Sequence, residues 1–321
     1  MSVAARIRPP ARARPRGLDR YGDVALKLLC GAACLLALSL LFDLAYTVFH
    51  RASPSISHFG IGFVGHTAWK PNFKIFGAGV PLYGTAVTSA MALLIALPVG
   101  VSIGLYLSLL APKRLRGIIG PLVELLAAIP SVILGFWGLI FLAPAVRDAE
   151  PWLHRTLGFI PLFGPPQTAG PSLFVAGLIL SIMVVPIIAS ISRDLFLTVP
   201  QELRDGAIAL GATRWEMVRG VILPSTTSGV ASAAVLGLGR ALGEAIAVAQ
   251  VIGAGTLIHH SLFETGDTMA SRIALQFPGY LNQQHVSALY YLAGILLIFS
   301  LITNLIAQGI QRRFNPAKGL A

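Results

Sequence analysis

The stretch SLFVAGLILSIMVVPIIASIS, residues 172–192, decides the fold class, because it is uncharged over a length that can cross a membrane. At 1.5 Å per residue, about 20 helical residues span the ~30 Å hydrocarbon core of a bilayer. Comparable apolar runs occur at residues 24–49, 81–110, 117–143, 225–252 and 287–308. Strands of a membrane barrel would be about ten residues long and would alternate in polarity. We therefore predict an all-α, polytopic membrane protein with six transmembrane helices.

The overall composition agrees with this fold class. Of the 321 residues, 55% are hydrophobic and 12% are charged, and the mean hydropathy is +0.76. One soluble core cannot hide that much apolar surface. Outside the helices we expect a basic, disordered tail over residues 1–23, an extracytoplasmic loop over 50–80 and a second tail over 309–321.

The basic residues set the orientation and account for the net charge of +11. With the N-terminus inside, 17 Lys and Arg residues fall in cytoplasmic segments and 6 in outside loops, and Arg240 within the membrane completes the 24. Such a bias marks the cytoplasmic side, so both termini are expected there. The apolar run after the basic head is too long for a signal-peptide core and lacks a convincing cleavage site, so it is predicted to be the first span.

Several familiar motifs lack the context that they need. GIGFVG, residues 60–65, fits a dinucleotide fingerprint but lies in an outside loop. GVSIG, residues 100–104, fits an esterase elbow but lies inside a span, where its glycines favour close helix packing. Cys30 and Cys34 share a face of the first span without other metal ligands nearby. With no GxxxxGK[ST] loop in the chain, we predict no metal or cofactor, and any ATP chemistry would have to come from a partner.

The cytoplasmic segment TVPQELRDGAIALGATRWEMVRGVILP, residues 198–224, lies between the fourth and fifth spans. Thr198 with Gln201 and Thr213 with Glu216 predict the starts of two short helices, and Gly211 suits the end of the first. In the first helix, Leu203, Ala207 and Leu210 fall at helical spacing. The alternatives are an ordinary connecting loop and a DNA-binding helix-turn-helix, but balanced charges and two membrane tethers favour docking on a protein over binding nucleic acid.

This segment resembles the EAA loop of ABC importer permeases, which reads E-A-A, three residues, Gly, nine residues, then I-x-L-P. Asp and Gly replace the first Glu and Ala here, while the spacing is kept. In that family the loop docks on the cytoplasmic ATPase. The resemblance implies a coupling role for a set of residues that also includes Arg204: Arg204, Asp205, Gly206, Ala207, Gly211, Leu223 and Pro224.

Four further stretches narrow the resemblance to the PstC-like permeases of Pst-type phosphate importers: LYGTAVTSAMALLIALPVGVSIGLYL, ELLAAIPSVILGFWGLIFLAP, LGATRWEMVRGVILP and GLGRALGEAIAV. The resemblance implies the MetI-like fold over 81–308. It also implies a second, PstA-like permease, a PstB-like ATPase dimer, a periplasmic phosphate-binding protein and phosphate as the cargo. The chain would then be a transport subunit and not an enzyme.

Two charges in the fifth span, Arg240 and Glu244, are the candidate translocation residues. Each would cost about 2.5–3.5 kcal/mol if it faced lipid. At i, i+4 they share a helix face and can pair, with Gly237, Gly239 and Gly243 keeping that helix slim. The residues alone leave open an inert ion pair, and the resemblance adds a role in phosphate passage. Glu124 in the third span is either a transport residue or a helix-packing acceptor.

Other functions remain as alternatives. A permease for another oxyanion, such as molybdate or sulfate, would share the same charged residues. A secondary anion transporter would leave the coupling segment unexplained. A membrane-embedded enzyme would need clustered catalytic or metal-binding groups in the spans, and the ionisable residues there do not form such a cluster.

Overall fold

The computed structural model describes residues 17–313, and the side chains of residues 21–310. The described chain is helical, with one isolated β-bridge between Lys70 and Ile75 and no strand. Of the predicted tails over 1–23 and 309–321, residues 1–16 and 314–321 lie outside the described residues. The rest of the tail prediction is wrong, because residues 17–23 and 309–313 are helical, and residues 50–59 of the predicted loop over 50–80 are helical as well. Six helical segments are long and apolar enough to span a membrane: Tyr21–Phe59, Gly79–Leu110, Ser131–Leu157, Leu173–Thr198, Arg214–Gly243 and Gln283–Ile310. The all-α, six-span prediction is confirmed.

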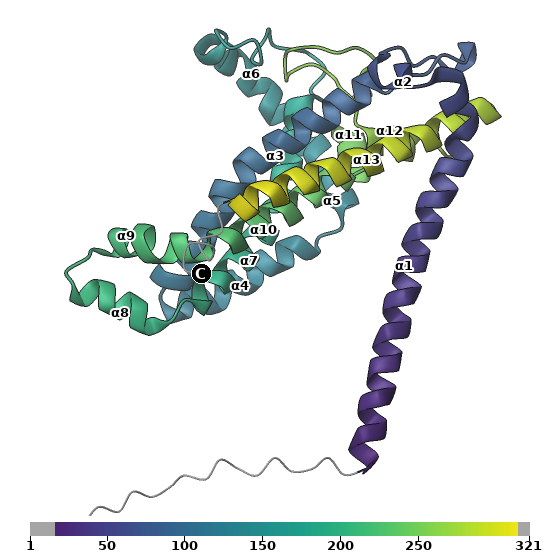
Figure 1. The fold of residues 1–321 in the computed structure, drawn as a ribbon. Coiled ribbons are helices and arrows are strands. Elements are labelled where there is room, and N and C mark those ends of the chain that lie inside the picture. Colours follow the sequence, from purple (N-terminus) through teal and green to yellow (C-terminus); the bar gives the residue numbers. More distant parts are fainter. Residues whose placement is uncertain (1–16, 314–321) are drawn as a thin grey trace, which may run out of the picture. The chain divides into compact units, whose positions relative to one another are not determined.

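The helices follow one another in the order α1 to α13 (Figure 1), and the longest connections join α6 to α7 and α11 to α12. Their bounds are α1 Gly17–Phe59, α2 Gly62–Gly65, α3 Gly79–Leu105, α4 Lys113–Ala128, α5 Ser131–Trp137, α6 Ala143–Leu157, α7 Leu173–Thr198, α8 Gln201–Ala209, α9 Arg214–Met217, α10 Leu223–Gly243, α11 Ile246–Val251, α12 Met269–Gln276 and α13 Gln283–Arg313. A 3₁₀ turn covers Pro71–Phe73 (η1), and π-helical turns cover Tyr106–Leu110 (η2), Gly138–Leu142 (η3) and Val218–Ile222 (η4).

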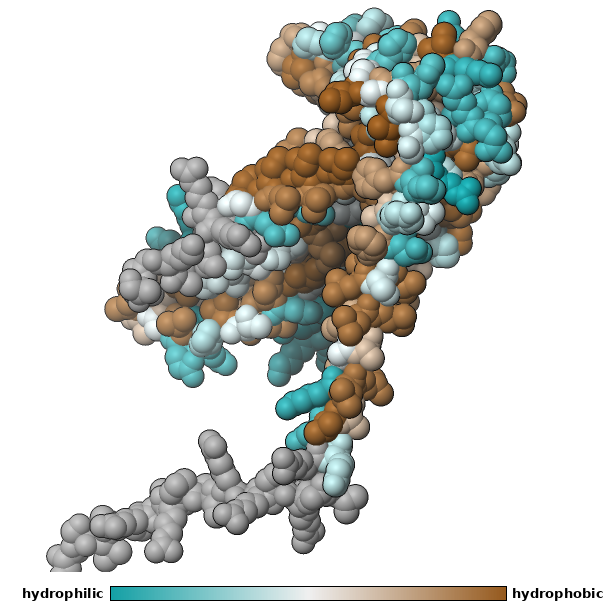
Figure 2. All heavy atoms as spheres, turned by 45° about the vertical axis from the view of Figure 1, so that its right-hand side comes forward, coloured by the Kyte–Doolittle hydropathy of each residue, from teal (hydrophilic) through white to brown (hydrophobic). Residues whose placement is uncertain are grey.

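The chain divides into two compact units, one up to His50 and one from Arg51 onward. In the first unit, α1 exposes apolar side chains on all sides, including Leu38, Leu40 and Leu41. A helix that is apolar all round is typical of a membrane span. In the second unit, hydrophobic residues cover the middle of the face in Figure 2 and hydrophilic residues gather at its ends, as expected for a bundle with a lipid-facing belt.

The core of the second unit is built around α7, which contacts α3, α4, α10 and α11. Close approach depends on glycine in α3. A Cβ at Gly100 would lie 2.8 Å from the Ile188 side chain, and one at Gly104 would lie 3.0 Å from the backbone nitrogen of Arg193. The predicted helix-packing role of these two glycines is therefore confirmed.

The predicted helix over 117–143 is wrong, because the chain breaks between α4 and α5. Ile129 and Pro130 have extended backbones, with ψ of 127° and 134°. The helical conformation is disfavoured for a residue that precedes proline, and proline itself has no N–H to donate. The third candidate span is consequently Ser131–Leu157, and α4 is a separate helix that packs on α7.

All three π-helical turns end two residues before a proline: Pro112, Pro144 and Pro224. Proline leaves a carbonyl in the preceding turn without its usual donor, and a π turn is one local adjustment to that loss. Pro224 thus fixes where the cytoplasmic segment joins α10.

Candidate functional site

The coupling segment is a helical hairpin formed by α8 and α9, at the end of the bundle to the left of Figure 1. The predicted capping box of Thr213 and Glu216 is confirmed: the Thr213 N–H donates to Glu216 Oε2 at 2.8 Å, and the Glu216 N–H donates to Thr213 Oγ1 at 3.3 Å. The predicted box of Thr198 and Gln201 is wrong. Helix α7 runs on to Thr198, whose hydroxyl donates to the Leu195 carbonyl at 2.7 Å, and Pro200 occupies the N-cap of α8 without a side-chain hydrogen bond.

The turn between α8 and α9 depends on Gly211, which has φ of +88°. Its N–H donates to the Ile208 carbonyl at 2.9 Å, and the Ala212 N–H donates to the Ala207 carbonyl at 3.1 Å. This is the left-handed helix ending for which glycine is favoured. No atom lies within 4 Å of a Cβ built at Gly211 or at Gly206, so conformation and not space requires glycine in the turn.

The inner face of the hairpin is fixed to the bundle. Arg204 Nη2 donates to the carbonyl of Phe196 near the end of α7. Ala207 and Leu223 pack against a buried cluster that includes Met217. Asp205 is exposed and lines, with Arg204, a shallow pocket of about 320 Å³ beside the end of α3.

The outer face of the hairpin exposes large apolar side chains. Leu210 is 92% exposed, Trp215 65%, Leu203 53% and Ile208 50%. Of the three apolar residues predicted at helical spacing, Ala207 alone turns inward. An exposed apolar patch on a helical hairpin is typical of a surface that docks on another protein.

Arg240 and Glu244 lie at a helix end, not within a continuous helix. The predicted helix over 225–252 is wrong, because α10 ends at Gly243 and Glu244 has extended backbone, with φ of −72° and ψ of 118°. Glu244 Oε1 accepts a hydrogen bond from the Ala247 N–H at 3.3 Å, at the start of α11. Since pairing at i, i+4 requires an unbroken helix, the predicted ion pair is not formed: within the described residues, neither side chain takes part in one.

Arg240 lines a hollow of about 630 Å³ between α7, α10 and α13, here called the Arg240 hollow. It is lined by Ile187, Ser232, Val235, Leu236, Gly239, Arg240, Asn304 and Gln308. Gly237 brings α10 close to α7, since a Cβ there would lie 2.7 Å from Val184, whereas Gly239 and Gly243 border open space. Of the three predicted glycines, Gly237 serves packing and Gly239 lines the Arg240 hollow.

Two amides in the last span were not predicted as site residues. Asn304 and Gln308 line the Arg240 hollow from α13, and Asn304 Oδ1 is buried with no hydrogen-bond partner in the described chain. Their signal in the sequence is spacing, because polar residues four apart in an apolar run share one helix face.

Glu124 forms an ion pair with Arg193, with 3.0 Å between Oε1 and Nη1. The pair joins α4 to α7. Arg193 also contacts its neighbour Asp194 at 2.9 Å. This contact supports the helix-packing alternative for Glu124.

A buried charge pair that the sequence did not predict lies beyond α11. Arg272 Nε donates to Asp267 Oδ2, and the two side chains are 2% and 4% exposed. Ser271 donates to Asp267 Oδ1 at 2.6 Å, and the Arg272 guanidinium lies 4.9 Å from the Trp69 ring centre. Burial raises the pKa of the Asp267 carboxyl, an effect opposed by the guanidinium and by these donors. The network ties the loop before α12 to the segment before α3.

A six-span bundle with a helical hairpin projecting at one end is the architecture of ABC importer permeases. The permease of a bacterial alginate ABC transporter matches with a TM-score of 0.63 at 18% identity, covering 92% of this chain and 98% of that one. The MetNI methionine ABC transporter in an inward-facing conformation matches with a TM-score of 0.50 at 21% identity, covering 73% and 96%. These similarities show the MetI-like fold.

The chain belongs to the family of binding-protein-dependent transport system inner membrane components, whose sequence pattern matches residues 96–318. It is 40% identical to the phosphate transport system permease protein PstC of Xylella fastidiosa, over 94% of each chain. It is also 40% identical to PstC of Mesorhizobium japonicum, over 99% of this chain and all of that one. A probable PstC of Methanocaldococcus jannaschii is 33% identical over 94% of this chain and 95% of that one. The chain is therefore a multi-pass membrane subunit of an ABC transport system, not an enzyme.

Proposed function

We propose that this chain is the permease subunit of an ATP-driven importer of inorganic phosphate and forms half of the translocation path. The observation that carries the proposal is the 40% identity to phosphate permeases over nearly the whole chain. The Arg240 hollow adds support, because it presents an arginine without an ion-pair partner among the described residues, inside a span.

In this proposal Arg240 receives the phosphate in transit. A guanidinium offers a planar fork of donors that fits two oxygens of a tetrahedral oxyanion. Asn304 and Gln308 supply neutral amide donors from α13 on the same hollow. Glu244 follows the end of α10, four residues after Arg240. In this proposal its carboxylate lies outside the Arg240 hollow and limits anion affinity through charge alone, so that phosphate is released.

The remaining subunits follow from the same proposal: a PstA-like permease that completes the path, a PstB-like ATPase dimer that binds ATP and Mg²⁺, and a periplasmic phosphate-binding protein. The exposed patch of Leu203, Ile208, Leu210 and Trp215 is the proposed ATPase contact. In a Cys30→Ala, Cys34→Ala background, Leu210→Cys should cross-link to the ATPase. The matched variant Ala207→Cys, which packs inward, should not, and equal cross-linking from both would contradict this contact.

The proposal places both termini in the cytoplasm of a bacterium, with α8 and α9 on the same side. Reporter fusions after Arg116 and Arg214 should then report cytoplasm, and fusions near Trp69 and Trp152 should report periplasm. The opposite result at two of these sites would overturn this orientation.

Anion selectivity is the direct test of the proposed cargo. The complex reconstituted in proteoliposomes should take up labelled phosphate only with ATP, and excess sulfate or molybdate should compete weakly. Uptake that molybdate or sulfate blocks as well as unlabelled phosphate does would assign the chain to another oxyanion.

A further inference from the structure

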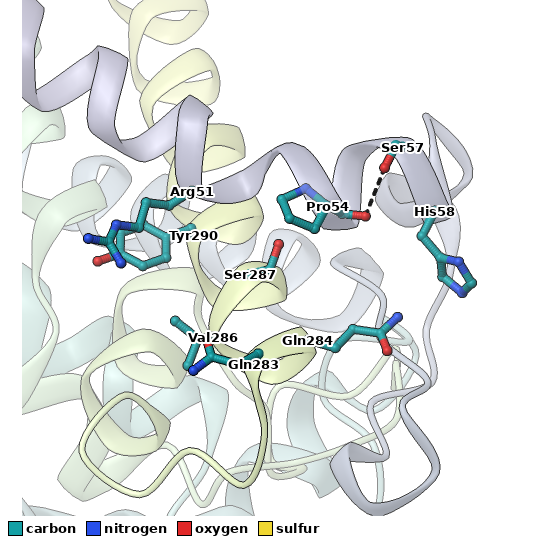
Figure 3. Close-up of a pocket in the computed structure, with 9 residues that line it drawn as sticks. All are labelled: Arg51, Pro54, Ser57, His58, Gln283, Gln284, Val286, Ser287 and Tyr290. Atoms are coloured by element: carbon teal, nitrogen blue, oxygen red, sulfur yellow. Dashed lines mark hydrogen bonds between the residues drawn. The ribbon is translucent and has the colours of Figure 1, made fainter.

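A third pocket, of about 560 Å³, lies between residues 51–58 of α1 and the first turns of α13. It is at the other end of the second unit from α8 and α9 (Figure 1), and it is separate from the Arg240 hollow. Its lining is Arg51, Pro54, Ser57, His58, Gln283, Gln284, Val286, Ser287 and Tyr290 (Figure 3). We name it the Arg51 pocket.

The lining of the Arg51 pocket is rich in hydrogen-bond donors. It combines a guanidinium, an imidazole, two primary amides and a phenol, and no carboxylate lines it. The side chains of Arg51, Gln283, Gln284 and Tyr290 make no hydrogen bond or ion pair within the described residues. Ser287 is already engaged, because it accepts from the Ser55 N–H at 3.1 Å. The free donors therefore suit an anion.

The sequence around the pocket keeps negative charge away from it. Residues 44–123 contain no Asp or Glu, and residues 268–321 contain none. Both walls of the pocket come from these two stretches. An anion that enters meets a positive guanidinium with no neighbouring acid on either wall to neutralise it.

The apolar runs of its two helices indicate that the pocket lies at the surface of the membrane. The apolar run over 24–49 ends two residues before Arg51, and the apolar run of α13 begins at 287. Tyr290 packs edge-on against Phe277, with 5.7 Å between ring centres. Tyrosine with an apolar body and a wet hydroxyl is typical of the headgroup level.

We propose that the Arg51 pocket binds a phosphate group at the membrane surface, with Arg51 as its charged donor and Tyr290 and Gln283 as neutral donors. Lipid headgroups and inorganic phosphate both carry this group. In either case the guanidinium binds two oxygens of a tetrahedral centre, and the neutral donors take the others. The site is distinct from the proposed path and does not depend on the cargo assigned to Arg240.

The test uses the two permease subunits with their ATPase, without the periplasmic phosphate-binding protein, in maltoside detergent, which contains no phosphate, and it has two arms. In the first, binding of ³²P-labelled inorganic phosphate is measured by equilibrium dialysis in an Arg240→Gln background, which removes the proposed path residue. In the second, phosphatidylglycerol binding is titrated by native mass spectrometry. Binding in the first arm alone identifies inorganic phosphate as the ligand, and binding in the second arm identifies a lipid headgroup.

Whichever ligand binds, Arg51→Gln should weaken it by about tenfold or more, because a charge-assisted hydrogen bond is lost. Tyr290→Phe keeps the ring contact with Phe277 and should weaken binding by about threefold. Lys70→Gln removes an exposed positive charge from residues 44–123, outside the pocket lining, and should leave affinity unchanged. The proposal is overturned if neither ligand binds, or if Arg51→Gln and Tyr290→Phe bind as Lys70→Gln does.

Discussion

Replacing Gly211 tests the coupling hairpin with little steric interference. A Cβ at this position meets no atom within 4 Å, and φ is +88°. A side chain therefore acts almost only through the backbone. For an L-residue with a Cβ, the left-handed conformation costs about 1–2 kcal/mol, which lowers the population of the native turn by a factor of about 5–30.

Valine and asparagine make the comparison decisive, because they are of similar size and differ in their tolerance of positive φ. Asparagine is enriched in the left-handed region, whereas a β-branched residue there is an outlier. We expect Gly211→Asn to keep phosphate uptake close to that of the unmodified complex. Gly211→Ala should lower it, and Gly211→Val should lower it most.

The assay measures ATP hydrolysis and ATP-dependent phosphate uptake in the same proteoliposomes. In Gly211→Val, the phosphate taken up per ATP hydrolysed should fall several-fold while the complex stays assembled. Uptake by Gly211→Val equal to the unmodified complex would refute the reasoning. So would an equal loss in Gly211→Asn, since the cause would then be size and not backbone conformation.

Two further predictions concern ion pairs. Arg272→Met should destabilise the protein by about 3–5 kcal/mol in SDS unfolding from mixed micelles, because it leaves the Asp267 carboxylate buried and unpaired. The double variant with Asp267→Asn should recover much of that loss, and strictly additive losses would contradict the pairing. Glu124→Gln should change the unfolding free energy by no more than about 1 kcal/mol, because its side chain is 54% exposed; a loss of uptake with unchanged stability would instead assign Glu124 to transport.

Patterns that depend on local chemistry could be read from the sequence. Apolar runs predicted six spans, because the bilayer fixes their length and polarity. The Thr213 and Glu216 box and the left-handed Gly211 depend on groups within a few residues of each other. The close approach at Gly100 and Gly104 followed from a motif whose only requirement is a missing side chain.

Errors arose where a break or a distant contact decides the structure. A hydropathy window does not register the loss of an N–H at Pro130, so α4 and α5 were merged. The same limitation hid the end of α10 at Gly243 and with it the separation of Arg240 from Glu244. Arg272 is buried against Asp267 and Trp69, which are distant from each other in the sequence. The charge of Arg272 alone predicted a residue in a solvated loop.

The central claim is that Arg240 carries phosphate through this subunit, and uptake by Arg240 variants tests it most directly. In proteoliposomes with the complete complex, Arg240→Gln should abolish ATP-dependent uptake of labelled phosphate while membrane insertion and assembly remain normal. Arg240→Lys should retain a small fraction, because it keeps the charge and loses the planar fork. Uptake by Arg240→Gln equal to that of the unmodified complex would contradict the account.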